Sequence, residues 1–312
     1  MARCLITREL TGTAPDRLAG AGHEVEVRRE RLPPSHLELL AAAPRFDALL
    51  TMLTDPVDEE VLAVSPDLHA IANYAVGTDN IDLNAATAQG IPVGNTPDVL
   101  TETTADLALA LMLALMRRLR EGEGEVRAGR WVTWEPARLL GRDLHGATVL
   151  IVGAGRIGRA VARRLEGFGC RVVTAGRGDE LDPLLGEADV VTLHCPLTRD
   201  TRGLIGAREL AAMKTGAYLV NTARGPIVDT EALVAALGEG SIAGAALDVT
   251  DPEPLPPEHP LTRVPGLLVV PHIASATHAT REAMADLAVD NLLAALAGER
   301  MPHCANPEVY ER

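Results

Sequence analysis

The sequence predicts an α/β protein made of two doubly wound parallel-sheet domains, on three observations. The chain has 312 residues, the usual length of roughly two domains. In the first 95 residues, short apolar runs alternate with helical patterns, which is typical of a parallel sheet with helices on both faces. A glycine-rich turn between a strand pattern and a helix pattern then begins at Gly153, near the middle of the chain, and indicates a second sheet of the same kind.

Composition and charge exclude several classes of function. Apolar residues make up 47% of the chain but aromatic residues only 2%, so the core must be built mainly from Ala, Leu and Val. The net charge of −14 argues against nucleic acid or an anionic membrane as the main partner. Four scattered cysteines without a C-x-x-C pair, and a first segment without the long apolar run of a signal peptide, indicate a cytoplasmic protein. We predict no metal site.

The first domain is expected over residues 1–98, where strands and helices follow one another. Strands are expected at 3–8, 23–29, 46–53, 68–77 and 91–95, and helices at 15–22, 35–43, 57–65 and 83–90. Doubly wound sheets bind ligands at the carboxyl ends of their strands. We therefore expect ligand contacts at Leu53 and Thr54 and in the segment 75–78.

A long helix and a glycine-rich segment follow the first domain. Residues 101–120 have threonines and acids at the start and arginines at the end, which suit the dipole of one helix about 30 Å long. Residues 121–144 contain both tryptophans of the chain, Trp131 and Trp134. Two interpretations stay open for this segment: a surface excursion with a buried tryptophan anchor, or an arm that packs on a second subunit.

The glycine-rich turn has the spacing of a dinucleotide-binding fingerprint. Strand 148–152 leads into Gly153, Ala154, Gly155, Arg156, Ile157 and Gly158, and a helix pattern continues to residue 169. The first glycine permits the tight turn, the second lets the backbone approach a pyrophosphate, and the third lets helix and strand pack closely. Because the helix N-terminus faces the phosphates, the sequence predicts a Rossmann domain that binds a dinucleotide.

The second half of the chain continues the alternation and then returns to the first domain. Strands are expected at 170–176, 189–196, 217–223, 242–249 and 267–272, and a final amphipathic helix at 280–297. If that helix packs on the first domain, the two domains comprise residues 1–98 with 282–312, and residues 99–281.

The end of the second strand of this domain favours NADP(H), with NAD(H) as the alternative. An acid at that position would bind the adenosine ribose and repel a 2′-phosphate, but the sequence has Gly176 followed by Arg177. Arginine can pair with a phosphate. Asp179 and Glu180 lie slightly later and are interpreted either as a displaced acid or as a solvated turn.

Three further strand ends carry groups suited to acid–base chemistry. Arg224 follows one strand and is suited to bind a carboxylate through its fork of donors. Asp248 and Glu253 follow the next strand, and His272 follows the last. A histidine paired with a carboxylate is a common general acid, so these residues predict a catalytic site on one sheet edge.

Six segments together resemble the D-2-hydroxyacid dehydrogenase family, and most resemble its glyoxylate/hydroxypyruvate reductase branch. They read NYAVGTDNID, NTPDVLTETTADLAL, VGAGRIG, NTARGPIVD, GAALDVTDPEPLPPEHPL and PHIASATHATR, and WVTWEP adds to the similarity. The resemblance implies a Rossmann coenzyme domain inserted in a flavodoxin-like substrate domain. It also implies reduction of a small 2-keto acid, glyoxylate or hydroxypyruvate, to the D-2-hydroxy acid, and a homodimer in which the tryptophan segment reaches the neighbouring subunit.

The resemblance also implies residue roles. Arg224 would bind the substrate carboxylate, His272 would donate the proton, and Glu253 would orient His272. Substrate contacts would come from Leu53, Val76 and Gly77. Beyond the glycine turn, Gly176 and Arg177, the cofactor contacts would be Cys195, Pro196, Thr222, Ala223, Asp248, His272 and Ala274.

Two other functions remain compatible with the same residues. Corepressors of this fold use it to sense nucleotides and can keep the same Arg, Glu and His, although this chain shows no long terminal extensions. A dehydrogenase for a specialised biosynthetic 2-hydroxy acid is the second alternative, because an arginine would bind any 2-keto acid.

Overall fold

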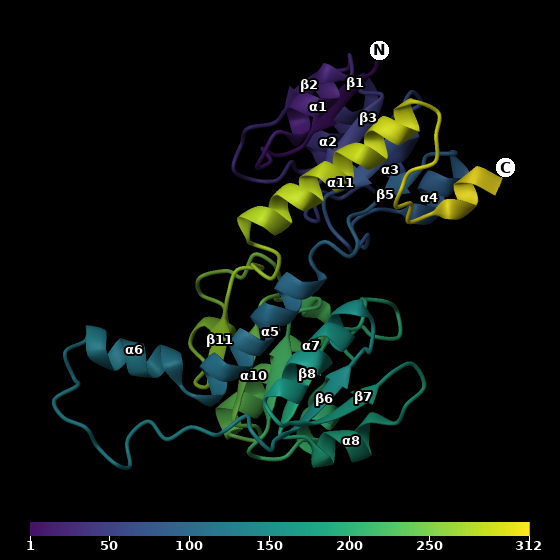
Figure 1. The fold of residues 1–312 in the computed structure, drawn as a ribbon. Coiled ribbons are helices and arrows are strands. Elements are labelled where there is room, and N and C mark those ends of the chain that lie inside the picture. Colours follow the sequence, from purple (N-terminus) through teal and green to yellow (C-terminus); the bar gives the residue numbers. More distant parts are fainter. Residues whose placement is uncertain (312) are drawn as a thin grey trace. The chain divides into compact units, whose positions relative to one another are not determined.

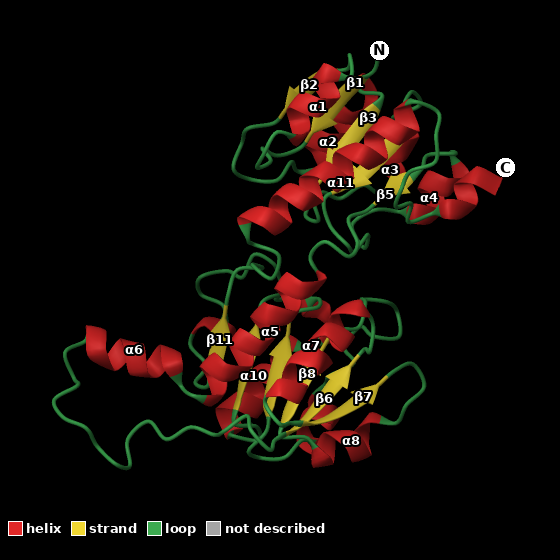
Figure 2. Cartoon of the chain, in the orientation of Figure 1, coloured by secondary structure: helices red, strands yellow, loops and turns green. Residues whose placement is uncertain are grey.

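The chain forms two compact units, each built on one parallel sheet. A computed structural model describes residues 1–311 (Figures 1 and 2). The first unit comprises residues 1–100 together with the segment from Ala276 onward, and the second comprises Thr101–Ser275. The predicted fold class, two doubly wound α/β domains, is confirmed.

The first unit has a five-stranded parallel sheet with the order β2-β1-β3-β4-β5. Its strands are β1 (Arg3–Ile6), β2 (Glu24–Val27), β3 (Ala48–Thr51), β4 (Ala70–Asn73) and β5 (Val93–Gly94). Its helices are α1 (Ala14–Gly20), α2 (His36–Ala42), α3 (Glu59–Ala63), α4 (Leu83–Ala88) and α11 (His278–Leu296), with short 3₁₀ turns η1 (Ala43–Arg45) and η4 (Pro307–Glu311). The chain reverses its winding direction between β1 and β3, so the loops after these strands lie where such sheets bind ligands.

Local sequence signals explain where these short helices begin. Ser35 and Glu38 form a capping box at α2, and the Asp58 and Asp82 side chains accept hydrogen bonds from backbone N–H groups at the starts of α3 and α4. Each such cap typically stabilises a helix by about 1 kcal/mol. Strands β3 and β4 are mainly aliphatic and completely buried, as expected for central strands covered on both faces, whereas the edge strand β2 alternates glutamate with valine.

Helix α11 joins the first unit although it lies near the end of the chain. It packs on β3, β4 and α1, and Arg17 of α1 forms ion pairs with Asp286 and Asp290 of α11. Tyr74 donates a hydrogen bond of 2.6 Å to the carbonyl of Arg281. These contacts explain why the boundary between the units precedes α11 at residue 276 rather than lying at 282.

The second unit has a six-stranded parallel sheet with the order β11-β10-β9-β8-β6-β7. Its strands are β6 (Thr148–Val152), β7 (Arg171–Ala175), β8 (Val190–Leu193), β9 (Tyr218–Asn221), β10 (Gly244–Leu247) and β11 (Leu267–Val269). Its helices are α5 (Thr101–Met116), α6 (Leu119–Arg127), α7 (Arg156–Gly167), α8 (Leu181–Glu187), α9 (Ala207–Ala212) and α10 (Thr230–Glu239), with the 3₁₀ turns η2 (Gly225–Ile227) and η3 (Pro260–Thr262). Winding reverses between β6 and β8, beside the glycine turn.

The single helix expected over residues 101–120 is wrong. Helix α5 ends at Met116, Arg118 adopts a left-handed φ of 53°, and α6 begins at Leu119. The chain comes back to the end of α5 at residues 141 and 142, and this contact explains why α5 ends there. The N–H of Arg142 donates to the carbonyl of Met116 at 2.9 Å. A Cβ at Gly141 would lie 2.2 Å from the same oxygen, so only glycine permits this approach.

Candidate active site

The glycine turn after β6 has the shape that a dinucleotide requires. Gly153 has a φ of +99°, and a Cβ there would lie 2.5 Å from the backbone nitrogen of Cys195. A Cβ on Gly158 would lie 2.2 Å from the carbonyl oxygen of Gly153, so glycine lets α7 pack against the turn. A Cβ on Gly155 would meet nothing within 4 Å, and Gly155 provides no side-chain cap to α7. The start of α7 is therefore open to a phosphate group.

The turn after β7 carries Gly176, Arg177 and Asp179, the residues on which the predicted coenzyme preference depends. Gly176 and Arg177 are both exposed. The carboxylate of Asp179 accepts a 2.7 Å hydrogen bond from the N–H of Gly176, so this acid is bound to its own turn. The Asp179 carboxylate thus lies beside Gly176 at the end of β7, and both interpretations of Asp179, as a displaced acid and as part of a solvated turn, stay open.

Four other predicted cofactor contacts lie at the ends of the central strands. Cys195 follows β8 and is half-buried, and burial raises the pKa of its thiol, while Pro196 next to it is exposed. Thr222 and Ala223 follow β9. The Thr222 hydroxyl lies 3.4 Å from Nδ1 of His194, whose pKa burial lowers to about 4. His194 is thus neutral near pH 7 and suited to a hydrogen bond with a neutral hydroxyl.

Arg224 lies in a turn whose backbone is held by the side chain of Asn221 and packs against Thr250. The buried Asn221 accepts from the N–H of Ala223 at 3.0 Å and donates to the carbonyl of Arg224 at 2.8 Å. A Cβ on Gly225 would lie 1.9 Å from the carbonyl oxygen of Thr250. The Arg224 turn therefore packs directly on the loop after β10, which carries Glu253.

The side chains of Glu253 and His272 lie within ion-pair distance of each other. Oε1 of Glu253 lies 2.6 Å from Nδ1 of His272, and Oε2 accepts a 3.3 Å hydrogen bond from the N–H of Thr250. The carboxylate thus ties the loop after β10 to the loop after β11. Because Nδ1 faces the carboxylate, Nε2 of His272 is the nitrogen available to a substrate.

Asp248 holds the backbone that carries His272. Its carboxylate accepts from the N–H of Ile273 at 2.6 Å and of Ala274 at 3.0 Å, and its carbonyl accepts from the N–H of His272 at 2.8 Å. Burial raises the pKa of Asp248, while the two N–H groups act against that rise. His272 has a φ of 52°, a left-handed conformation that is uncommon for a residue other than glycine. The Asp248 hydrogen bonds therefore fix a conformation that the isolated chain would disfavour.

The predicted catalytic residues thus meet on three adjacent strand ends of one sheet. Arg224 follows β9, Glu253 follows β10 and His272 follows β11, and these three strands are neighbours. A guanidinium, a carboxylate-oriented imidazole and a dinucleotide turn on one sheet edge can bind an anion and transfer a proton beside a bound nicotinamide. Within residues 1–311 no cluster of His, Cys, Asp and Glu is suited to hold a metal ion.

The predicted substrate contacts of the first unit lie in two loops after β3 and β4. Leu53 follows β3, and Val76 and Gly77 follow β4; all three are half-buried. The carbonyls of Val76 and Gly77 accept hydrogen bonds from Asn95 and Asn73 at 2.8 and 2.9 Å. Neither residue's N–H has a hydrogen-bond partner among the described residues, so the loop offers donors to an anion.

Sequence reasoning missed the side chains that hold these loops and turns. Asn73, Asn80 and Asn221 carry this role; Asn73 and Asn221 are the last residues of buried strands, whereas Asn80 lies in the loop that leads to α4. Asparagine is common in turns for many reasons, so its presence at these positions is a weak sequence signal.

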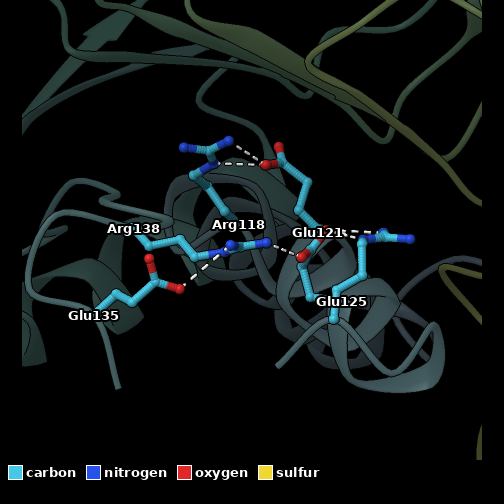
Figure 3. A network of polar contacts seen from close by, with 6 residues as sticks. Arg118, Glu121, Glu125, Glu135 and Arg138 are labelled. Atoms are coloured by element: carbon cyan, nitrogen blue, oxygen red, sulfur yellow. Dashed lines mark hydrogen bonds and ion pairs between the residues drawn. The ribbon is translucent and has the colours of Figure 1, made fainter. Parts of the chain in front are cut away.

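The tryptophan segment and the start of α6, residues 119–144, form a mostly exposed arm with several ion pairs. Glu125 of α6 binds Arg130 at 2.8 Å and also Arg138, which reaches Glu135 at 3.3 Å, and Arg118 pairs with Glu121 (Figure 3). Trp131 and Trp134 are 69% and 79% exposed, so the interpretation as a buried tryptophan anchor is wrong. Helix α6 buries none of its residues in this chain.

Comparisons with known proteins agree with this geometry. Residues 109–274 match the family model "D-isomer specific 2-hydroxyacid dehydrogenase, NAD binding domain". A glyoxylate reductase of Korarchaeum cryptofilum is 46% identical, with 99% of this chain and 97% of that protein covered. A crystal structure of a Thermus thermophilus protein has a TM-score of 0.92 at 51% identity and covers 97% of this chain and 99% of the other.

A further solved structure carries both a nucleotide and an acid. It is an NADPH-dependent glyoxylate/hydroxypyruvate reductase of Sinorhizobium meliloti in complex with NADP and malonate. Its TM-score is 0.87 at 34% identity, and the match covers 98% of this chain and 97% of the other. In the part of this chain that the structure describes, no helix has both the length and the apolar character to cross a membrane.

Proposed function

Because the chain belongs to the D-isomer specific 2-hydroxyacid dehydrogenase family, we propose that it uses NADPH to reduce glyoxylate or hydroxypyruvate to the D-2-hydroxy acid. The single observation that carries this proposal is the 2.6 Å contact between Glu253 and His272, next to the fixed turn of Arg224. The names of the relatives support the substrate class. In this proposal the second unit binds the coenzyme and the first binds the substrate.

Each catalytic residue has a distinct role in this reaction. Arg224 binds the substrate carboxylate and polarises the ketone through its planar fork of donors. Glu253 accepts from Nδ1 of His272, so the protonated ring presents Nε2–H to the carbonyl oxygen. The N–H groups of Val76 and Gly77 bind the carboxylate, and Leu53 contacts the rest of the substrate.

The nicotinamide dinucleotide would be held by residues 153–158, with its 2′-phosphate at Arg177 and its pyrophosphate at the start of α7. Further contacts would come from the residues after the central strands: Cys195, Pro196, Thr222, Ala223, Asp248 and Ala274. When bound, it supplies the hydride for the ketone carbon. The proton that completes the alcohol comes from His272.

Initial rates with a panel of 2-keto acids and NADPH test this proposal. We expect turnover with glyoxylate and hydroxypyruvate, and D-glycerate as the product of the second. Preference for a larger 2-keto acid would make the specialised biosynthetic role the better account. Nucleotide binding without turnover of any panel member would instead support the sensing role.

Gly176→Asp should shift the coenzyme preference from NADPH toward NADH. The new carboxylate would stand at the end of β7 and repel the 2′-phosphate, whereas wild-type Arg177 attracts it. We expect the ratio of kcat/KM for NADPH to that for NADH to fall by roughly tenfold or more, the size of a single charged contact. A wild-type protein with equal or higher kcat/KM for NADH would refute the NADPH preference.

We also propose that the chain is a homodimer in which the arm supports the partner's active site. The arm exposes Trp131, Val132, Trp134 and Leu140, although its ion pairs give it a defined form. Exposed tryptophan is costly in water and is enriched in interface hot spots.

Trp134→Ala should weaken dimerisation or raise KM. Truncation of a hot-spot tryptophan commonly costs about 2 kcal/mol of binding, or roughly 30-fold in the dimer dissociation constant. Light scattering across a dilution series measures this change. A monomer mass at micromolar concentration, together with unchanged kinetics of Trp134→Ala, would exclude the dimer.

A further inference from the structure

A network of buried and half-buried polar side chains joins the two loops of the first unit that the proposed function assigns to the substrate. The loops are Met52–Asp55 after β3 and Ala75–Thr78 after β4. The last residues of the two strands, Thr51 and Asn73, are register partners in the sheet. The hydroxyl of Thr51 donates to Oδ1 of Asn73 at 3.1 Å, so the network begins where the strands end.

Asn80 holds the first loop. Its Nδ2 donates to the carbonyl oxygens of Met52 and Asp55, each at 3.0 Å. The backbone of Asn80 is itself fixed, because its carbonyl accepts from the N–H of Val57 at 2.9 Å. The carboxamide therefore binds both ends of the turn that carries Leu53.

Asn73 holds the second loop and also contacts Asn80. Its Nδ2 donates to the carbonyl of Gly77 at 2.9 Å and to Oδ1 of Asn80 at 3.0 Å. The two carboxamides thus bind each other, and each holds one loop. A displacement of either loop would break hydrogen bonds that also fix the other, because buried polar networks stabilise their members jointly.

Two more side chains fix the outer ends of the loops. Asp55 is fully buried and accepts from the N–H of Met52 at 2.8 Å and from the hydroxyl of Thr7. Asn95 donates to the carbonyl of Val76 at 2.8 Å. The carbonyls of Val76 and Gly77 are therefore bound inside the protein, which leaves their N–H groups for a ligand.

We propose that Asn80 is a positioning residue that joins the substrate loops after β3 and β4 into one rigid unit. The inference rests on the proposed function, because it concerns how the Val76–Gly77 N–H groups and Leu53 are held toward the 2-keto acid. Asn80 itself contacts no substrate. It acts through the loop carbonyls, so its loss affects binding of the acid and not of the dinucleotide.

Steady-state kinetics of Asn80→Ala and Asn80→Asp test this role. Both variants lose the donors to Met52 and Asp55; Ala also removes side-chain volume, whereas Asp keeps the volume and instead places a carboxylate oxygen against the two carbonyls. We expect KM for glyoxylate to rise about tenfold in each, from the loss of two hydrogen bonds. KM for NADPH stays at its wild-type value, and kcat falls less than KM rises.

Asn306→Ala is the matched control. Asn306 is a buried asparagine of the first unit, whereas Asn80 is half-buried, and Asn306 donates to Thr87 and to the carbonyl of Ile91 rather than to either loop. We expect it to lower the melting temperature while KM for glyoxylate stays unchanged. If both Asn80 variants fail to fold, Thr51→Val removes one network bond isosterically and should raise KM by roughly two- to threefold.

The outcomes separate the inference from the proposed function. An active wild type whose folded Asn80 variants, or Thr51→Val, keep the wild-type KM for glyoxylate would refute the positioning role alone. An increase in KM for NADPH as large as that for glyoxylate would also refute it, because general loosening would then explain both. A wild type that reduces no 2-keto acid would overturn both proposals.

Discussion

His272→Asn should lower kcat for glyoxylate reduction by about 10²–10⁴, the usual contribution of a general acid. The reason is that Glu253 lies 2.6 Å from Nδ1 of His272, which in the proposed reaction donates the proton to the substrate. Asparagine is the appropriate replacement because it tolerates the left-handed φ of 52° at this position. KM for NADPH should change far less than kcat, since the dinucleotide turn lies after β6 and His272 would be only one of many cofactor contacts.

His145→Ala provides the control for a general effect of histidine loss. His145 lies in the same unit and is exposed, and Nδ1 of its ring lies 3.0 Å from the carbonyl oxygen of Phe168. We expect wild-type kcat in this variant. A His272→Asn protein with native-like melting and full turnover would remove His272 from the reaction.

Arg224→Lys should lower kcat/KM for 2-keto acids by about 10²–10³, the cost of losing one aligned donor to a developing charge. Lysine keeps the positive charge but loses the planar fork that binds a carboxylate through two parallel bonds. The turn itself should persist, because Asn221 binds the backbone of Ala223 and Arg224 rather than the side chain.

Arg171→Lys is the matched control for this substitution. Arg171 is an exposed arginine of the same unit and pairs with Glu187 at 3.1 Å. Its replacement should leave both kcat and KM unchanged. Equal kcat/KM in Arg224→Lys and wild type would show that the carboxylate is bound elsewhere.

The residues proposed for catalysis could be located from the sequence because the strand pattern places them. Arg224, Glu253 and His272 each follow an aliphatic run, and in a parallel sheet such positions meet at one edge. Glycine is required at 153 by its left-handed φ and at 158 by the close approach of α7 to the turn, and the spacing of the motif alone predicts both.

Features that depend on long-range contacts could not be predicted in the same way. The break between α5 and α6 depends on Arg142 and Gly141 returning to Met116, and nothing near residue 117 in the sequence signals it. The Asn73–Asn80 network likewise depends on β3 and β4 lying side by side in register. Local sequence patterns predict the helices and strands. The hydrogen bonds between distant residues follow only from the way the folded chain packs.

The most direct test of the proposed reaction follows the hydride itself. Wild-type protein is incubated with glyoxylate and NADPH that carries deuterium at the transferable position of the nicotinamide ring, and the product is examined by mass spectrometry. The account predicts glycolate with one deuterium on its alcohol carbon, formed in proportion to the NADPH consumed, and almost none with His272→Asn over the same time. Glycolate without deuterium, or NADPH that stays unconsumed while bound, would contradict it.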